Sequence, residues 1–184
     1  MNRFIIVGSP RTQGRSAALA ENLFEACIEE YPEDELALAP LSTLHIEGCT
    51  EENTPFTQEE ADLRADTLFD CDDDMAEIYE FLDAADELVV VSPVFFSAAP
   101  AQLCALMNRL QPYYFTDVRK KEKRPLTLHI VGEGGDPHGY EALITQVKSA
   151  FAVAGFKLDR VLDWVGKISE TGEILEDADV IDVK

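Results

Sequence analysis

The chain has 184 residues, 46% of them hydrophobic, which is enough for one compact domain with a real core. Its 15 basic and 36 acidic residues give a net charge of −21, which excludes nucleic acid and anionic membranes as partners, because both need basic surfaces. No apolar run is long enough to span a membrane, and the first strand pattern leaves no room for a signal peptide, so we expect a cytoplasmic protein.

The N-terminal part of the sequence predicts a strand, a helix and a second strand. Residues 3–7 are apolar in succession, which is typical of a strand buried on both faces. Apolar residues at helical spacing predict a helix over residues 15–30, which Pro32 stops. Residues 35–41 alternate more weakly and contain Pro40, which favours a strand near the sheet edge.

A long irregular region follows. Residues 42–71 form an insertion-like stretch, in which residues 59–68 favour a short acidic helix. Three consecutive aspartates, residues 72–74, then open a helix that continues to about residue 85. We interpret these aspartates as caps that complement the helix dipole rather than as metal ligands.

The centre of the chain contains the clearest strand. Residues 87–91 are almost wholly apolar and predict a central, fully buried strand, which ends in the loop of residues 92–99. Pro100 begins a helix that runs to about Pro112, since proline is favoured in a first helical turn. The basic stretch 119–124 follows this helix and holds five of the fifteen basic residues.

The C-terminal part repeats the alternation. Residues 125–131 predict a fourth strand, and the glycine-rich loop 132–139 separates it from a helix over residues 140–154. Residues 157–162 predict a fifth strand. We expect the acidic tail, residues 165–184, to hold a turn and either a short helix or frayed chain.

Strands and helices therefore alternate from one end of the chain to the other. This order predicts a single domain over residues 1–184, with a flavodoxin-like three-layer sandwich around a five-stranded parallel sheet in the order 2-1-3-4-5. In such sheets ligands bind beyond the carboxyl ends of the strands. The loops 8–16, 92–99 and 132–139 should converge there.

The loop of residues 8–16 is suited to an anion. It is rich in Gly, Ser and Arg and it ends at a helix N-terminus, where unpaired backbone N–H groups and the helix dipole attract negative charge. Five residues separate Gly8 from Gly14 and Arg15 stands in place of a lysine, so the loop fails the triphosphate motif. The dinucleotide glycine fingerprint is also absent. We expect a phosphate of another kind.

The loop after the central strand is suited to a planar ring. Pro93, Val94, Phe95 and Phe96 offer apolar walls and backbone amides to a heterocycle. The alternative, that the two phenylalanines only cap the core, stays open.

At this point the sequence resembles the NADPH-dependent FMN reductase family. The stretch Ser92-Pro93-Val94-Phe95-Phe96, continued by Ala101-Gln102-Leu103 and Asn108-Arg109, is similar to the family's ring-binding stretch. Gly8-Ser9-Pro10-Arg11 with Gly14 and Ser16 is similar to its phosphate loop, and Asp73-Asp74-Met75 to a third family motif. The resemblance covers residues 3–155.

The resemblance implies a cofactor, its site and a reaction. It implies FMN as cofactor, NADPH or NADH as electron donor, a homodimer with flavin near the interface, and hydride transfer to FMN and on to a small acceptor such as a quinone or flavin. Phosphate binding is implied for Ser9, Arg11, Gln13, Gly14, Arg15 and Ser16. Ring contacts are implied for Pro93, Val94, Phe95, Phe96, Gly132, Gly134 and Gly135.

The chain departs from its iron–sulfur relatives. Iron–sulfur flavoproteins carry a compact cysteine cluster before the Asp-Asp-Met motif, whereas Cys49 and Cys71 stand alone here, so we expect no metal site. The remaining cysteines, Cys27 and Cys104, fall on helical patterns and are read as small core residues. The basic stretch 119–124 is the only patch that could attract the phosphates of NADPH; the alternative is a solvated loop.

The flavin performs the redox chemistry, so we assign no catalytic side chain. The backbone N–H groups of residues 94–96 are expected to bind the edge of the ring, and His138 is a proton donor or simply a solvated loop residue. Two other functions remain open: a non-enzymatic electron-transfer protein like flavodoxin, and a module that has lost flavin, in which Phe96 and Ser97 would fill the pocket.

Overall fold

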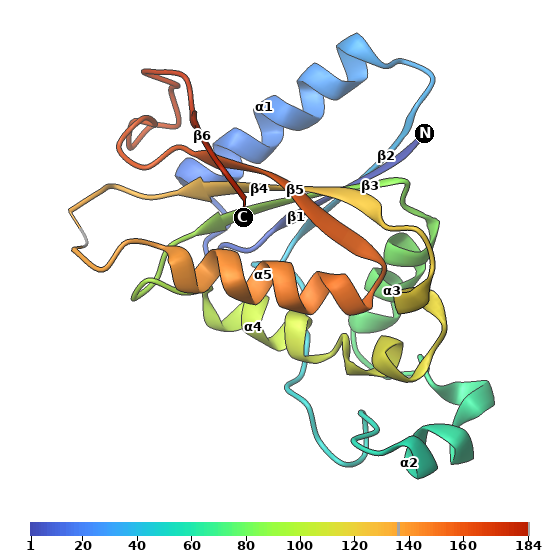
Figure 1. Cartoon of the computed structure of the whole chain (residues 1–184). Helices are drawn as coiled ribbons and strands as arrows, with labels where there is room; N and C mark the ends of the chain where they lie inside the picture. The colour runs from blue at the N-terminus through green and yellow to red at the C-terminus, as the bar shows by residue number, and fades with distance from the viewer. Residues whose placement is uncertain (136, 184) are drawn as a thin grey trace.

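The computed structural model describes residues 1–135 and 137–183. Within these residues six strands form one sheet in the order β2-β1-β3-β4-β5-β6 (Figure 1). The parallel strands are β1 (Asn2–Val7), β2 (Glu35–Pro40), β3 (Glu87–Pro93), β4 (Arg124–Val131) and β5 (Phe156–Asp163). The flavodoxin-like order of these strands agrees with the prediction.

The expectation of a five-stranded, wholly parallel sheet is wrong in one respect. A sixth strand, β6 (Asp179–Ile181), pairs antiparallel with β5. It lies in the acidic tail, for which a short helix or frayed chain was expected. Val180 and its neighbours provide enough extended backbone to pair with the open edge of β5, which local sequence pattern does not reveal.

The helices lie on both faces of the sheet. They are α1 (Arg15–Glu30), α2 (Gln58–Leu63), α3 (Met75–Ala84), α4 (Ala101–Asn108) and α5 (Glu141–Val153), with short 3₁₀ turns at Ala65–Thr67, Gln111–Phe115 and Val118–Lys120. The step from β1 to β2 runs along the sheet in the direction opposite to the later steps. Since each crossover is right-handed, α1 covers one face while α3, α4 and α5 cover the other (Figure 1).

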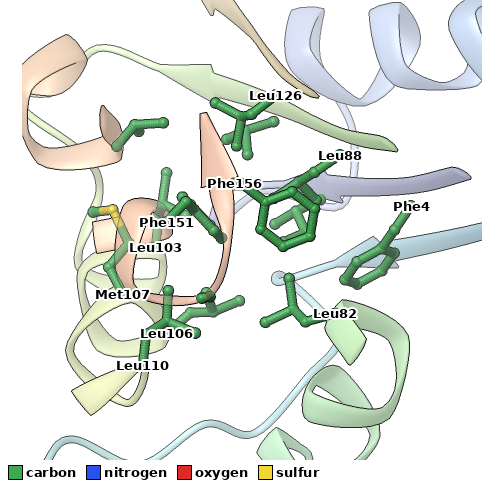
Figure 2. Packing of buried hydrophobic residues seen from close by; sticks show 14 of the residues in the cluster. Phe4, Leu82, Leu88, Leu103, Leu106, Met107, Leu110, Leu126, Phe151 and Phe156 are labelled. Carbon is green, nitrogen blue, oxygen red and sulfur yellow. The ribbon is translucent and has the colours of Figure 1, made fainter. Parts of the chain in front are cut away.

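Two apolar cores result. The larger one lies between the sheet and the helices α3, α4 and α5, where Phe4, Leu88 and Phe156 from the strands meet Leu82 and Phe151 from the helices (Figure 2). The smaller one lies beneath α1 and contains alternate residues of the strands, together with Leu19, Ala20 and Ile168. Successive side chains of a strand point to opposite faces, so two cores require strands that are apolar throughout.

The irregular region 42–71 projects below the sheet in Figure 1 and contains α2. Thr57 begins this helix in a capping box with Glu60. Backbone N–H groups at the start of the region donate to two aspartates: His45 to Asp74 at 2.6 Å and Glu47 to Asp73 at 2.8 Å. The aspartates therefore anchor the region as well as preceding α3.

Two further findings concern the whole chain. Each of the four cysteines, all in the described part of the chain, is a free and half-buried thiol, and Cys104 packs against the edge of the larger core. Among the helices of the described residues, none has the length and apolar character needed to cross a bilayer.

Candidate functional site

A cavity of about 160 Å³ lies where three adjacent strands end. The loops after β1, β3 and β4 surround it, because the carboxyl ends of parallel strands meet at one edge of the sheet. Its lining is Ser9, Arg11, Gln13, Gly14, Arg15, Ser16, Pro93, Val94, Phe95, Val131, Gly132 and Glu133.

The structure brings together ten of the thirteen residues that the sequence singled out, all in the described part of the chain. Phe96, Gly134 and Gly135 are not part of the lining. Val131 and Glu133 line it without having been predicted. Val131 ends β4 and Glu133 follows Gly132 in the third loop, so the convergence of that loop on the site was the signal that could have identified them.

The N-terminus of α1 faces this cavity without a cap. Gly14 occupies the cap position with a φ of 130°, no side chain accepts from the first turn, and that turn contains no acidic residue. The first bond of the helix runs from the Ala18 N–H to the Gly14 carbonyl at 3.0 Å, so the preceding amides have no partner within the helix. These amides and the helix dipole together favour an anion.

The two arginines of the loop, Arg11 and Arg15, differ in the hydrogen bonds that their side chains make within the protein. The Arg15 Nε donates to the Ile168 carbonyl at 2.9 Å. The Arg11 side chain is exposed, and no residue in the described ranges makes a hydrogen bond or ion pair with its guanidinium. The Arg11 N–H donates to the buried Ser9 hydroxyl at 3.1 Å, which shapes the loop. Arg11 is therefore available to an anion in the cavity.

Gly8 allows the loop to leave β1 close to α4. Its N–H donates to the Val91 carbonyl at 2.8 Å, which continues the sheet. A Cβ at this position would lie 2.8 Å from Leu103 Cδ2, closer than side-chain atoms approach. Glycine is therefore favoured here, because a larger residue would require the buried Leu103 side chain to shift.

Pro93, Val94 and Phe95 form the wall of the cavity at the end of β3. The Val94 N–H already donates to the Val131 carbonyl at 3.2 Å, and the Phe95 N–H to the Ala98 carbonyl at 3.0 Å. The expectation that residues 94–96 all offer N–H groups to a ring is therefore wrong for Val94 and Phe95. Of the three, Phe96 alone keeps its amide outside these bonds.

Phe96 and Ser97 occupy the tip of a tight turn with positive φ values of 53° and 65°. Such values are unusual for a bulky residue and store local strain. The Leu143 N–H of α5 donates to the Ser97 carbonyl at 3.1 Å and holds the turn in place. The Phe96 side chain is 98% exposed, so it does not fill the cavity as the hypothesis of a lost flavin site required.

The third loop contributes less than expected. Gly132 lines the cavity and a Cβ there would lie 3.3 Å from Val165, whereas Gly134 and Gly135 lie outside it. His138 is exposed on the same loop and is not part of the lining.

The basic stretch 119–124 lies at the opposite end of the sheet. It leads into the first residue of β4, whereas the cavity adjoins the last residue of that strand. Lys123 and Arg124 donate to backbone carbonyls of the body, including those of Ala152 and Ala154. Within one chain this stretch therefore does not border the cavity.

The geometry of the cavity fits a phosphorylated planar ligand. Its lining combines the uncapped N-terminus of α1, Arg11, whose guanidinium has no partner among residues 1–135 and 137–183, and the apolar residues Pro93, Val94 and Phe95. The phosphate of FMN would lie at the first and its ring system against the second. For a metal ion the donors are lacking: in the described ranges no three His, Cys, Asp or Glu side chains come together.

Comparison with known proteins gives a consistent picture. Residues 1–166 match the model of the NADPH-dependent FMN reductase family. The iron–sulfur flavoprotein of Methanosarcina thermophila is 55% identical over 38 residues, which is 21% of this chain and 20% of that protein. The match thus spans a fifth of the relative's length.

Solved structures share the fold at low identity. An FMN-dependent NADH-azoreductase from Bacillus anthracis, in complex with FMN, has 14% identity and a TM-score of 0.60 over 95% of this chain and 92% of that one. An NAD(P)H:quinone oxidoreductase from Methanothermobacter marburgensis has 17% identity and a TM-score of 0.56, covering 91% and 88%.

Proposed function

The chain belongs to the NADPH-dependent FMN reductase family, and we propose that it is an FMN-binding, NAD(P)H-dependent oxidoreductase built as one domain. The observation that carries the proposal is the pairing of two surfaces across one cavity. One surface is the N-terminus of α1, which has no cap and no acidic residue in its first turn, together with Arg11. The other surface is the apolar wall of Pro93, Val94 and Phe95.

The phosphate would be held at the α1 end of the cavity. Arg11 supplies an exposed positive charge, and the first-turn amides supply fixed donors that need no reorganisation. The buried hydroxyls of Ser9 and Ser16 lie beside them. This set recognises a doubly charged phosphate even though the whole chain carries a charge of −21.

The ring would lie against the end of β3. Pro93 and Val94 line one part of the cavity. Of the Val94, Phe95 and Phe96 amides, only that of Phe96, which lies beside the lining, has no backbone partner among the described residues and could donate to a ring edge. When bound, FMN accepts hydride from the nicotinamide and delivers reducing equivalents to the acceptor. The chain's own part is binding, orientation and exclusion of water, so no side-chain acid or base is assigned.

The acceptor is a small molecule such as a quinone, an azo compound or a free flavin. The similar structures from Bacillus anthracis and Methanothermobacter marburgensis are named for azo and quinone substrates. Phe95 and Phe96 are 41% and 98% exposed beside the cavity, and they supply aromatic surface for a planar acceptor. The family match favours this oxidoreductase over a flavodoxin-like electron carrier.

The face formed by α4 and α5 would join two copies of the chain. A groove of about 660 Å³ between these helices is lined by uncharged residues alone, among them Met107, Tyr114 and Val153. In a chain with 28% charged residues and a charge of −21, an uncharged face lets two copies meet without close contacts between like charges. A homodimer would therefore form through this face, and Val153→Glu should yield monomers in light scattering.

The reaction would take place in the cytoplasm. Reduced nicotinamide is supplied there, and four free thiols are stable in a reducing compartment.

A spectrum of the purified protein tests the proposal. We expect a flavin absorbance, or restoration of one when FMN is added to apoprotein, with FMN at a hundred times its Kd raising the free energy of unfolding by about 2.7 kcal/mol. Anaerobic NADPH or NADH should then bleach the flavin, and a quinone should restore its colour. A protein that shows neither a flavin spectrum nor stabilisation by FMN would contradict the binding proposal. Bound flavin that neither nicotinamide reduces would contradict the oxidoreductase.

A further inference from the structure

The segment of residues 164–175 touches both sides of the cavity. It begins beside the third loop, where the Trp164 N–H donates to the Ile130 carbonyl at 2.8 Å and the Gly166 N–H donates to the Gly132 carbonyl at 2.9 Å. It then reaches the start of α1, where the Ile168 carbonyl accepts from Arg15 at 2.9 Å. Figure 1 shows this segment beside the N-terminal end of α1.

Ile168 anchors the segment in the smaller core. Its side chain is 3% exposed and packs in the cluster that contains Val7, Leu19 and Val131. Val7 and Val131 are the last residues of β1 and β4, directly before the first and third loops of the site. Because protein cores are close-packed, the position of Ile168 constrains the ends of both strands.

The rest of the segment is a hairpin that lies along one flank of α1. The Ser169 N–H donates to the Glu173 carbonyl at 2.9 Å, and the Leu175 N–H to the Lys167 carbonyl at 2.8 Å. Gly172 approaches α1 so closely that a Cβ on it would lie 2.5 Å from the Ala18 Cβ. Ala18 is three residues after Arg15, so both residues are on the flank that the hairpin covers.

We propose that Arg15 is a positioning residue, which ties this hairpin to α1 and thereby holds the first and third loops of the site in place together, while Arg11 supplies the side-chain charge that binds phosphate. The proposal rests on the FMN site described above. Arg15 lines the cavity, but its Nε donates to the Ile168 carbonyl of the hairpin, whereas an anion would lie beyond the free amides at the start of α1. The Arg11 guanidinium has no such commitment to any residue in the described ranges.

Affinities for FMN and riboflavin, measured on the apoprotein, separate the two roles. Riboflavin lacks the phosphate, so the ratio of its Kd to that of FMN isolates phosphate recognition. We expect Arg15→Met to weaken both ligands about tenfold with the ratio unchanged, because the Ile168 carbonyl loses a charged donor and the first and third loops, which border the whole cavity, both loosen. We expect Arg11→Met to weaken FMN about tenfold or more and to leave riboflavin unchanged.

A second pair of variants tests the hairpin without touching Arg15. Ile168→Ala removes the anchor and should also weaken both flavins at a constant ratio, with a cavity cost that thermal unfolding records. Leu175→Ala is the matched control, because this side chain of the same hairpin is 58% exposed. It should change neither affinity.

Several results would overturn the inference. If Arg15→Met reduces the affinity for FMN alone, Arg15 is a phosphate ligand. If the variant changes neither affinity, Arg15 does not position the loops of the site. Wild-type protein that binds neither flavin would overturn the proposed function together with this inference. If the wild-type protein binds FMN but the ratio of the riboflavin Kd to the FMN Kd falls towards 1 in Arg15→Met, this inference alone is overturned.

Discussion

Arg109 donates a 2.6 Å hydrogen bond to Asp73, and the two side chains are only 1% and 7% exposed. Both also hold Glu47: its N–H donates to Asp73 at 2.8 Å and its carbonyl accepts from Arg109 at 3.3 Å. The two residues come from the motifs that open α3 and end α4. This buried ion pair therefore fastens the irregular region 42–71 to the body of the protein.

Loss of one partner of this pair should be costly. Asp73→Asn is expected to lower the free energy of unfolding by about 3 to 5 kcal/mol, because Arg109 is left buried without its counter-charge. Urea denaturation would measure the loss. The exposed pair of Asp117 and Lys120 is the matched control, and Asp117→Asn should change stability by less than about 1 kcal/mol. Equal effects of the two variants would contradict the role of the buried pair.

Acid should weaken the same pair. Burial alone would raise the pKa of Asp73, but the hydrogen bonds from the Glu47 N–H and from Arg109 outweigh it and hold the pKa below its usual value. A carboxyl with a depressed folded pKa stabilises the protein above its unfolded pKa, near 4, and loses that contribution as pH falls through the folded value. Wild type should thus lose more stability than Asp73→Asn between pH 5 and pH 2.

Burial of His129 should make the stability of the protein depend on pH between about 6.5 and 4, above the range in which Asp73 acts. Burial, and then the charge of Arg160, lower its pKa from 6.5 to about 4. The Trp164 Nε1 donates to His129 Nδ1 at 3.0 Å, which requires that nitrogen to be unprotonated. The unfolded chain takes up the proton first, so stability is complete above pH 6.5 and falls by roughly 3 kcal/mol as pH approaches 4.

The fluorescence of Trp164, the single tryptophan, would follow unfolding at each pH. His129→Gln should show a smaller loss between pH 6.5 and pH 4 than wild type. His45→Gln is the control, since the His45 side chain is 79% exposed, and it should behave as wild type. A loss of the same size in His129→Gln would contradict the assignment to His129.

Arg124 should be a structural residue rather than part of a nicotinamide site. Its guanidinium donates to the carbonyls of Leu82 and Ala85 at 2.8 and 2.7 Å and to that of Ala154 at 2.9 Å, at the C-terminal ends of α3 and α5. Arg124→Met should lower the free energy of unfolding by about 3 kcal/mol. Its effect on the KM for NADPH should be negligible.

Arg119 provides the comparison for Arg124. It belongs to the same basic stretch but stacks on the exposed ring of Tyr114, 4.3 Å from the ring centre. Arg119→Met should lower the free energy of unfolding by less than about 1 kcal/mol. A raised KM for NADPH in either variant would show that this stretch takes part in binding the donor.

Substitution of glycine for Phe96 in the turn of positive φ values should stabilise the protein. Phe96→Gly is expected to raise the free energy of unfolding by about 1 kcal/mol, because glycine adopts a φ of 53° without strain and the lost side chain is already exposed. Thermal unfolding would measure the gain. Phe95→Gly is the matched control: it removes a less exposed ring without relieving a positive φ and should destabilise the protein. Loss of stability in both would show that the turn is not strained.

Much of the fold could be predicted because it depends on local pattern. The apolar run of residues 3–7 and the helical spacing of residues 15–30 each predicted an element that the structure contains at nearly the same bounds. The alternation of strands and helices predicted a parallel sheet with helices on both faces, and five strands fitted the flavodoxin-like order. Strand β6 was missed because three residues of ordinary sequence became a strand only by pairing with β5.

The candidate site also has a part that the sequence determines and a part that only the tertiary structure decides. Sequence alone determined which loops form it, since a glycine- and serine-rich loop before a helix and an apolar loop after a central strand follow from local chemistry. Only the tertiary structure decided which donors remain available. The Val94 amide is occupied by Val131 and the Arg15 Nε by Ile168, and such partners, distant in sequence, become neighbours only when the strand ends and the C-terminal segment pack together.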